Sequence, residues 1–282
     1  MSTDTTADPP DPATDTEEQS VSTTFAVTGM PVYPDLAGKV AVVTGGSGAI
    51  GAATAALLAA SGVAVCVVGR SQGALDSVVD QVCSRGGQCV GVAADCTLES
   101  DVQSLRAQVE ARLGAPEILC TFAGGDGRPV ATDTETAEHW RRVTDSELTS
   151  TFLTIAAFLP AMIEAHRGVI VTMASAAARQ AAKSSAAYAA AKAGVIALSR
   201  HLAGEYAHAG IRVNCLAPSA VENDKMRSSM SDEQRRALGA AFPLGRIGQP
   251  EDVAAATAFL ASAGASWITG VTLDISGGKV ML

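Results

Sequence analysis

The stretch KVAVVTGGSGAIGAATAALLAA (39–60) decides the fold. It begins with an apolar, β-branched run, typical of a strand buried on both faces, and ends in an Ala-rich segment that predicts a helix over 49–60. The glycine-rich turn between them lets the backbone approach an anion closely, and the helix N-terminus offers unpaired N–H groups. Such a turn also occurs without a ligand, but its place between the first strand and first helix favours dinucleotide binding. The residues expected to bind are Gly45, Ser47, Gly48, Ala49, Ile50 and Gly51.

Outward from this stretch, short apolar runs alternate with longer helical patterns to the end of the chain. This alternation, with right-handed crossovers, predicts a doubly wound, seven-stranded parallel sheet of the Rossmann type with helices on both faces. The predicted strands are 39–45, 64–69, 89–95, 117–124, 168–175, 211–218 and 271–278. The predicted helices are 49–60, 71–85, 99–113, 137–164, 186–208, 231–241 and 251–263.

The composition sets the domain organisation and the class of partner. Residues 1–30 are rich in Thr, Asp and Pro, which predicts a disordered tail, and residues 31–282 are predicted to form one Rossmann-type α/β domain. The net charge of −9 and the lack of a basic cluster exclude nucleic acid as an expected partner. The apolar stretch 49–69 is interpreted as a buried helix and strand, so no membrane association is expected.

The cysteines and histidines indicate the compartment and argue against a metal. The six cysteines include no C-x-x-C pair and fall mainly in predicted core strands, which favours free thiols in a reducing cytoplasm. The four histidines show no metal-ligand spacing, so no metal site is expected.

The end of the second strand indicates which dinucleotide binds. An acidic residue there would hold the adenosine ribose hydroxyls of NAD, but the sequence has Arg70-Ser71. A guanidinium and a hydroxyl suit a 2′-phosphate, so NADP(H) is favoured and NAD(H) is the alternative. The competing interpretation is an ordinary surface arginine at a strand exit.

Tyr188 and Lys192 are the candidate catalytic pair. They lie four residues apart on a predicted helix, so they share one face. A phenol is a poor proton donor or acceptor at neutral pH, and a cationic neighbour stabilises its ionised form. Ser175 lies at the end of the fifth strand, where ligands of parallel sheets bind, and its hydroxyl is expected to bind a substrate carbonyl beside the tyrosine.

With these residues in place, the chain resembles the compact, single-domain branch of the short-chain dehydrogenase/reductase family, from about Leu36 to Gly278. The matching pieces are TGGSGAIG (44–51), Asp95, Ala123-Gly124, Ser175, YAAAK (188–192), RVNCLAPSAVEN (212–223), PLGRIGQPEDVAAATAFLAS (243–262) and ITGVTLDISGG (268–278).

The resemblance implies hydride transfer between a nicotinamide and a ketone or secondary alcohol. Tyr188 would be the acid/base, Ser175 would orient the carbonyl, and Lys192 would tune the tyrosine and hold the nicotinamide ribose. It also implies cofactor contacts by Asp95 and Cys96 at the adenine, by Ala123 and Gly124, and by Pro218, Val221 and Asn223.

Four positions depart from the family pattern. Ala49 replaces a glycine, Thr121-Phe122 replaces Asn-Asn, and Pro218-Ser219 with Asn223 replaces Pro-Gly and a threonine. The fourth is Glu147, which occupies the place of the family's catalytic asparagine, a residue that helps hold a water of the proton relay. Three readings of Glu147 stay open: it keeps the relay, it pairs with Lys192 and blunts its effect on Tyr188, or it points elsewhere.

The substrate side of the sequence is less specific. The segment 220–244 is an amphipathic lid over the substrate by analogy with the family, and it indicates no more than a medium-sized ketone. Arg179 and Lys183 on the facing wall are interpreted as surface charges, with recognition of an acidic substrate as the alternative.

The Ala-rich helices 137–164 and 186–208 are apolar nearly all round, which requires burial on every face. In the family these helices form subunit interfaces, so a homotetramer is expected, with a dimer as the alternative. The rival functions are an NAD-dependent alcohol dehydrogenase and a dinucleotide-binding sensor that performs no redox chemistry. Intact Ser175, Tyr188 and Lys192 favour an enzyme over the sensor.

Overall fold

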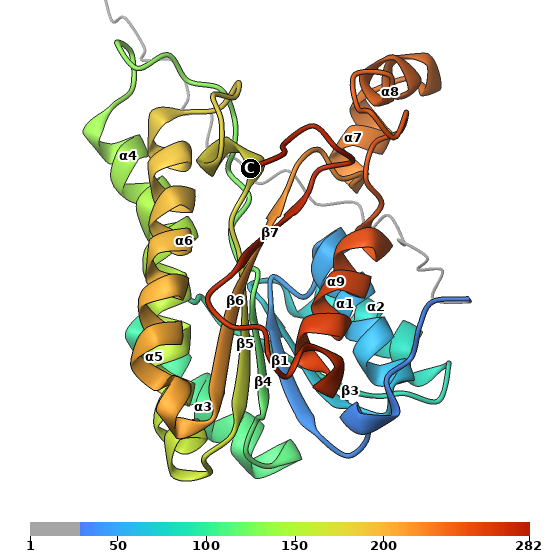
Figure 1. Ribbon diagram of the computed structural model, residues 1–282, viewed down its shortest axis with the longest axis vertical. Coiled ribbons are helices and arrows are strands. Elements are labelled where there is room, and N and C mark those ends of the chain that lie inside the picture. The colour runs from blue at the N-terminus through green and yellow to red at the C-terminus, as the bar shows by residue number, and fades with distance from the viewer. Residues whose placement is uncertain (1–28) are drawn as a thin grey trace, which may run out of the picture.

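Seven parallel strands form one sheet in the order β3-β2-β1-β4-β5-β6-β7, with helices on both faces (Figure 1). The computed structural model describes residues 29–282. The strands are β1 (Val40–Thr44), β2 (Ala64–Gly69), β3 (Gln88–Ala93), β4 (Ile118–Thr121), β5 (Gly168–Met173), β6 (Ile211–Pro218) and β7 (Thr272–Ile275). The predicted doubly wound sheet is confirmed, and each predicted strand is present at the expected place, with ends that match or differ by at most three residues.

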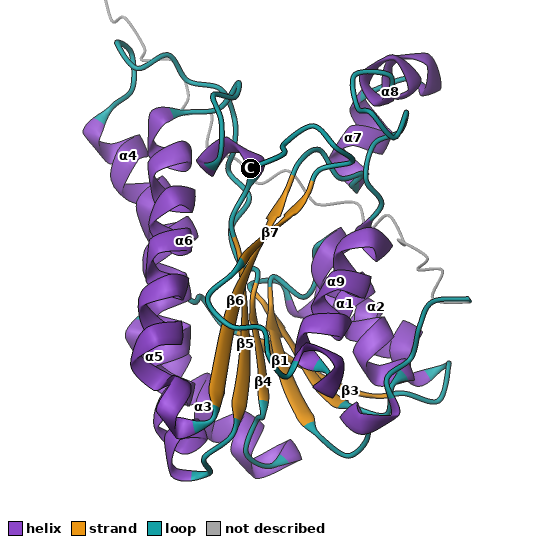
Figure 2. Cartoon of the chain, viewed as in Figure 1, coloured by secondary structure: helices purple, strands orange, loops and turns teal. Residues whose placement is uncertain are grey.

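Two layers of helices cover the sheet, as Figure 2 shows. The helices are α1 (Ala49–Ala60), α2 (Gln72–Cys83), α3 (Glu99–Leu113), α4 (Ala137–Thr144), α5 (Ser150–Glu164), α6 (Ala186–Tyr206), α7 (Asp224–Ser229), α8 (Asp232–Gly239) and α9 (Pro250–Ala261). One core cluster lies between the sheet and α1, α2 and α9, and a second lies between the sheet and α3, α5 and α6. The central strand β1 is buried along its whole length because both faces are covered.

The strand order reverses between β1 and β4, and this switch point opens the crevice where ligands of such sheets bind. The two strand ends are tied together by the Thr44 hydroxyl, which accepts hydrogen bonds from the backbone N–H groups of Phe122 (3.0 Å) and Ala123 (3.1 Å). Gly45 lies so close to this segment that a Cβ there would be 2.6 Å from the carbonyl oxygen of Phe122. The glycine-rich turn is therefore packed directly against the loop that follows β4.

The helix predicted over 137–164 is present with these bounds, but it is not α-helical throughout. The structure divides this segment into α4, a π-helical turn (Asp145–Thr149) and α5. A π turn widens the helix by one residue and occurs frequently at functional sites. The hydrophobic periodicity of the sequence did not reveal the π turn, because α4 and α5 on either side both keep a helical spacing.

The same segment, Ala137–Glu164, is long and apolar enough to cross a membrane by length and composition, with a mean hydropathy of 1.4. Half of the 18-residue window that has this hydropathy is buried against the rest of the protein. It contributes Ile155, Phe158 and Met162 to the core beside the sheet, which is the role of a core helix.

Three further expectations concern the lid, the burial of two helices and the N-terminal tail. The lid has two helices, and the six-residue α7 was missed because it is too short to show a periodic pattern. The complete burial expected of the helices at 137–164 and 186–208 is not found in the isolated chain, since Phe152 on α5 is 52% exposed. The predicted disordered tail lies almost entirely in residues 1–28, outside the described residues.

Candidate active site

The N-terminus of α1 forms a cradle for an anion at the switch point. Gly48 caps the helix without a side-chain hydrogen bond, so the first N–H groups of α1 are not used by a capping side chain. A Cβ at Gly51 would overlap the carbonyl of Gly45, and Gly45 itself has φ +65°, a conformation that favours glycine. Ala49 and Ile50 form the first turn beside them and are half-buried. The residues present therefore fit the pyrophosphate of a dinucleotide.

The ends of β2 and β3 form the side of the crevice expected to hold the adenosine. A Cβ at Gly69 would lie 3.1 Å from Ser47 Oγ, so the glycine-rich turn and the end of β2 meet. Arg70 follows at the surface and is exposed. Ser71 caps α2, accepting a hydrogen bond from the N–H of Ala74 at 3.4 Å.

After β3, the side chain of Asp95 is held by Thr97. Its Oδ1 accepts hydrogen bonds from the Thr97 hydroxyl (2.7 Å) and N–H (2.9 Å). These bonds, together with the charge of Arg70, hold the pKa of Asp95 below its ordinary value against the opposing effect of burial. Cys96 is buried, and burial raises the pKa of its thiol to about 11, so it is present as a neutral thiol.

Tyr188 and Lys192 are positioned by the start of α6. Ser185 is fully buried and caps this helix, accepting a hydrogen bond from the N–H of Tyr188 at 3.2 Å. One turn later the Lys192 side chain is buried, and its Nζ lies 5.7 Å from the centre of the Tyr188 ring. Nζ also donates a hydrogen bond to the carbonyl oxygen of Met173 at the end of β5, at 2.9 Å. The predicted pair is thus brought together.

Glu147 reaches the same lysine from the π turn. Its side chain is completely buried, and its Oε2 lies 2.8 Å from Lys192 Nζ as an ion pair. Oε2 has no other hydrogen bond in the part of the chain that the structure describes. Burial is the largest single effect and would lower the pKa of Lys192, but the charge and hydrogen bond of Glu147, together with Tyr188 and Cys215, outweigh it, so the pKa lies above its ordinary value. The structure thus shows Glu147 paired with Lys192, so the interpretation in which it points elsewhere is wrong.

The second carboxylate oxygen of Glu147 binds the loop after β4. Oε1 accepts hydrogen bonds from the backbone N–H groups of Gly125 (2.5 Å) and Asp126 (2.8 Å). Gly124 has φ +125°, and a Cβ there would lie 2.7 Å from the Glu147 carboxyl carbon. The sequence indicated neither contact, because both depend on a loop that returns to a helix some twenty residues later in the chain.

Ser175 follows β5, as predicted. It caps a short 3-10 helix, Ala176–Ala178, and its Oγ accepts a hydrogen bond from the N–H of Ala177 at 3.2 Å. This bond uses a lone pair of Oγ and not its hydrogen, so the hydroxyl can still donate to a substrate oxygen. The hydroxyl is half-buried at the C-terminal end of the sheet.

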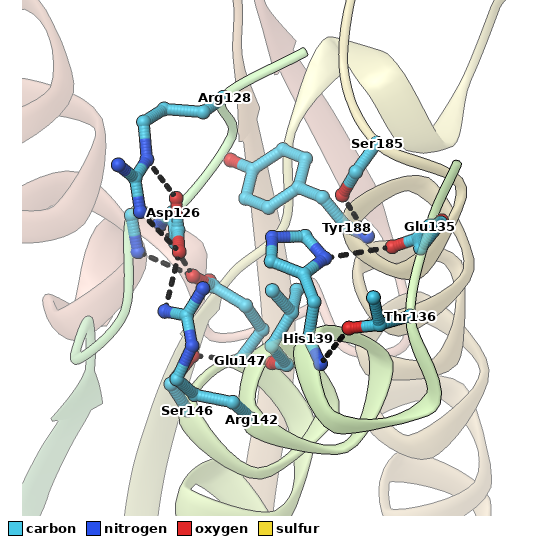
Figure 3. Close-up of polar contacts among 12 residues, drawn as sticks. Asp126, Arg128, Glu135, Thr136, His139, Arg142, Ser146, Glu147, Ser185 and Tyr188 are labelled. Atoms are coloured by element: carbon cyan, nitrogen blue, oxygen red, sulfur yellow. Dashed lines mark hydrogen bonds and ion pairs between the residues drawn. The ribbon is translucent and has the colours of Figure 1, made fainter. Parts of the chain in front are cut away.

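The loop after β4 also forms a wall beside Tyr188. A Cβ at Gly127 would lie 3.3 Å from the tyrosine ring. Next to it, Asp126 accepts hydrogen bonds from Arg128 Nε (2.9 Å) and Arg142 (2.7 Å), and these bonds hold the pKa of Asp126 well below its usual range. Figure 3 shows this cluster and Tyr188 in one view.

A second polar pair, Glu135 and His139, belongs to the start of α4. Nδ1 of His139 lies 2.9 Å from Glu135 Oε1, and Thr136 between them caps the helix (Figure 3). Because α4 packs against α6, the pair belongs to the same side of the molecule as Tyr188. Neither residue belongs to a motif, so neither was predicted from the sequence.

The lid side of the crevice starts at the end of β6. Pro218 is the last residue of that strand, Val221 is buried and forms a β-bridge with Gly248, and Asn223 caps α7 by accepting a bond from the N–H of Met226 at 2.9 Å. On the facing wall, Arg179 donates to both carboxylate oxygens of Asp274, at 3.1 and 3.0 Å. Its guanidinium is thus held by β7, which counts against the alternative of Arg179 as a free cation for an acidic substrate.

This arrangement defines a class of protein. A glycine-lined anion cradle at the switch point of a doubly wound sheet, with a phenol, a buried ammonium and a serine beside it, is the site of a dinucleotide-dependent oxidoreductase. Residues 29–282 contain no group of three side chains suited to hold a metal ion.

Comparisons with known proteins agree with this class. The family model described as enoyl-(acyl carrier protein) reductase matches residues 45–279. The chain is 36% identical over 248 residues to 3-oxoacyl-(acyl-carrier-protein) reductase FabG of Vibrio cholerae, covering 88% of this chain and 100% of the relative. It is 38% identical over 241 residues to cis-4-hydroxycyclohexanecarboxylate dehydrogenase of Sinomonas cyclohexanicum, covering 85% and 96%.

A solved structure titled crystal structure of gox2181 superposes with a TM-score of 0.83 at 33% identity, covering 87% of this chain and 98% of that one. The chain belongs to the short-chain dehydrogenase/reductase family. It is an NAD(P)-dependent oxidoreductase acting on ketone or alcohol groups.

Proposed function

We propose that the protein is an NADP(H)-dependent ketoreductase, with Tyr188 as acid/base, Ser175 orienting the carbonyl and Lys192 supporting the tyrosine. The observation that carries the proposal is the buried ammonium of Lys192, which lies 5.7 Å from the centre of the Tyr188 ring and donates to the carbonyl oxygen of Met173 at the end of β5. A cation so placed stabilises a phenolate, which a tyrosine needs if it is to exchange a proton with a substrate oxygen.

The bound nicotinamide supplies a hydride to the carbonyl carbon, or accepts one in the reverse direction. In reduction, the Tyr188 hydroxyl gives its proton to the carbonyl oxygen as that oxygen gains negative charge. The Ser175 hydroxyl donates a hydrogen bond to the same oxygen and fixes its direction. Lys192 then stabilises the phenolate that remains, until a proton returns from solvent.

The cofactor would lie along the crevice from the glycine-rich turn to the lid. Gly45 to Gly51 would hold the pyrophosphate, while Asp95 and Cys96 would border the adenine. Ala123 and Gly124 would line the middle of the crevice, and Pro218, Val221 and Asn223 would close it. Tyr188 and Lys192 would meet the nicotinamide ribose.

Arg70 and Ser71 support NADP(H) over NAD(H). No acidic side chain stands at the end of β2, where it would repel a 2′-phosphate, and Arg70 is exposed at that end. We expect Arg70→Ala to weaken NADPH binding by about tenfold or more, the loss of a charge-assisted hydrogen bond, with little change for NADH. Fluorescence titration with each cofactor measures this, and equal weakening of both would rule out the assignment.

The same protein tests the reaction when NADPH oxidation is followed with a panel of ketones. The named relatives process an oxoacyl group and a hydroxycyclohexanecarboxylate, so the panel should include medium-sized linear and cyclic ketones. Turnover of any of them supports the ketoreductase, and turnover only with NAD⁺ and alcohols supports the NAD-dependent alternative. Tight cofactor binding without turnover in either direction supports a sensor.

We also propose a cytoplasmic homotetramer. Its support is the set of apolar side chains left exposed on the single chain, including Phe152 on α5, Leu273 on β7 and Trp267, which is 99% exposed. The free cysteines of the described residues, five of them buried, are consistent with a reducing compartment. Sedimentation equilibrium measures the assembly directly.

A further inference from the structure

We propose that Glu147 is a positioning residue that ties the loop 124–127 to Lys192 through one carboxylate, and so sets both the wall beside Tyr188 and the charge next to it. The inference deepens the proposed function, on which its kinetic readout rests. It assigns to Glu147 a role different from that of the water-binding asparagine expected at this position.

The first support is the division of labour between the two carboxylate oxygens. Oε1 accepts the N–H groups of Gly125 and Asp126, and Oε2 pairs with Lys192. One rigid group thus contacts two elements, the loop after β4 and the helix α6. An asparagine is one methylene shorter and carries no charge, so it could not supply both contacts in the same way.

The second support is the shape of the loop over the carboxylate. A Cβ at Gly124 would overlap Glu147 Oε2, so the backbone passes directly over the charged group. Three residues later, Gly127 lies against the Tyr188 ring at a separation that leaves little room for a Cβ. The loop therefore connects the position of Glu147 to the position of the wall beside the phenol.

The third support is burial. Glu147 is 0% and Lys192 3% exposed, so each charge is stable in the interior only with its partner. The π turn delivers the carboxylate to this point, since it packs against α6. Removing one partner would leave an uncompensated charge beside the reacting tyrosine.

Several other ionisable groups face this pair and define the electrostatic background. Tyr188 faces the pair from α6, and the thiol of Cys215 faces it from β6. Burial raises the pKa of this thiol, so it stays neutral. From the loop there is Asp126, already paired with Arg128 and Arg142. On α4, His139 is paired with Glu135. Glu147 is therefore the negative charge that lies directly on Lys192.

The deciding variant is Glu147→Gln, which keeps the side-chain shape and an acceptor for the loop but removes the charge. Loss of a negative charge favours proton release from the remaining groups, so the coupled Tyr188–Lys192 titration should move to lower pH by about one to two units. The KM for the ketone should stay within about threefold, since the loop keeps its acceptor. Glu147→Ala loses the acceptor as well, and its KM should rise by about tenfold or more.

Two readouts test the shift. The first is the pH profile of kcat for alcohol oxidation. The second needs no turnover and follows phenolate formation by ultraviolet absorbance during a pH titration. The titration curve of the Tyr188→Phe variant is subtracted from that of the wild-type protein, and the same difference is measured in the Glu147→Gln background. The chain has only three tyrosines, so this difference is measurable. Should no ketone or alcohol react, the proposed function fails while the phenolate titration still decides this inference.

The matched control is Asp145→Asn, which removes the same charge from the same π turn at an exposed position. The proposal is supported if the titration midpoint shifts in Glu147→Gln but not in Asp145→Asn, and if Glu147→Asp returns the midpoint toward the wild-type value. Equal midpoints in wild type and Glu147→Gln, or an equal shift in Asp145→Asn, would overturn it. Circular dichroism melting of each variant confirms that folded proteins are compared.

Discussion

At the scale of single residues, the site is organised around charges that are matched before any ligand arrives. Lys192 has a carboxylate, a carbonyl oxygen and an aromatic ring as neighbours. Its charge therefore persists in the interior, where an unpaired ammonium would lose its proton. Tyr188 thus lies beside a cation whose charge the surrounding groups stabilise against the effect of burial.

Tyr188→Phe removes the proton donor while keeping the ring that packs beside Gly127. We expect kcat to fall by at least about 10²-fold, the usual contribution of general acid–base catalysis, while cofactor affinity changes little. Steady-state kinetics and fluorescence titration measure the two quantities. A variant that retained most of its kcat would show that another group carries the proton.

At the scale of elements, the site depends on how α6 begins. Ser185 is fully buried and its hydroxyl accepts the N–H of Tyr188, so the cap of the helix and the position of the catalytic residue are one feature. The π turn has a similar effect on Glu147, since it lies at the junction of α4 and α5. In both cases the local backbone conformation fixes the position of the residue whose side chain enters the site.

Ser185→Ala removes this N-cap. The expected loss of unfolding free energy is about 1 kcal/mol, with a lower kcat because the first turn of α6 carries Tyr188. Urea unfolding measures the first and steady-state kinetics the second. Ser231→Ala is the matched control, because it removes the cap of α8 in the lid; if both variants lost kcat equally, the effect would not be specific to α6.

At the scale of the whole molecule, acid stability reflects carboxylates that the fold holds ionised. The pKa of Asp252 is lowered by hydrogen bonds from Arg246, that of Asp126 by Arg128 and Arg142, and that of Asp95 by Thr97. A carboxylate with a lowered folded-state pKa stabilises the native state above its unfolded pKa of about 4, and this stabilisation is lost as the pH falls through the folded-state value.

The free energy of unfolding should therefore decrease from about pH 5 toward pH 2. Asp252→Asn should cost less than about 1 kcal/mol at neutral pH, because the Arg246 side chain is 52% exposed, and the difference from wild type should shrink in acid. Urea unfolding at several pH values measures both. Asp80→Asn, an exposed carboxylate on α2, serves as control; a cost for Asp252→Asn that did not change with pH would contradict the explanation.

The order of strands and helices and the position of the catalytic motif could be predicted from the amino-acid sequence alone. Helical and strand periodicities and the glycine-rich turn are local signals, so they can be recognised without knowing any tertiary contact. For this reason α1, β2, α3 and β6 begin and end where predicted. The Tyr188–Lys192 pair was predictable because four residues make one turn of a helix.

The surroundings of that pair, in contrast, became apparent in the folded structure alone. Glu147 meets Gly125 across 22 positions, Thr44 meets Phe122 across 78, and Arg179 meets Asp274 across 95. None of these contacts has a periodic signature, because each depends on loops and strand ends that the folded sheet brings together. The balance of charges around Lys192 is therefore a property of the fold, and the proposed proton transfer depends on it.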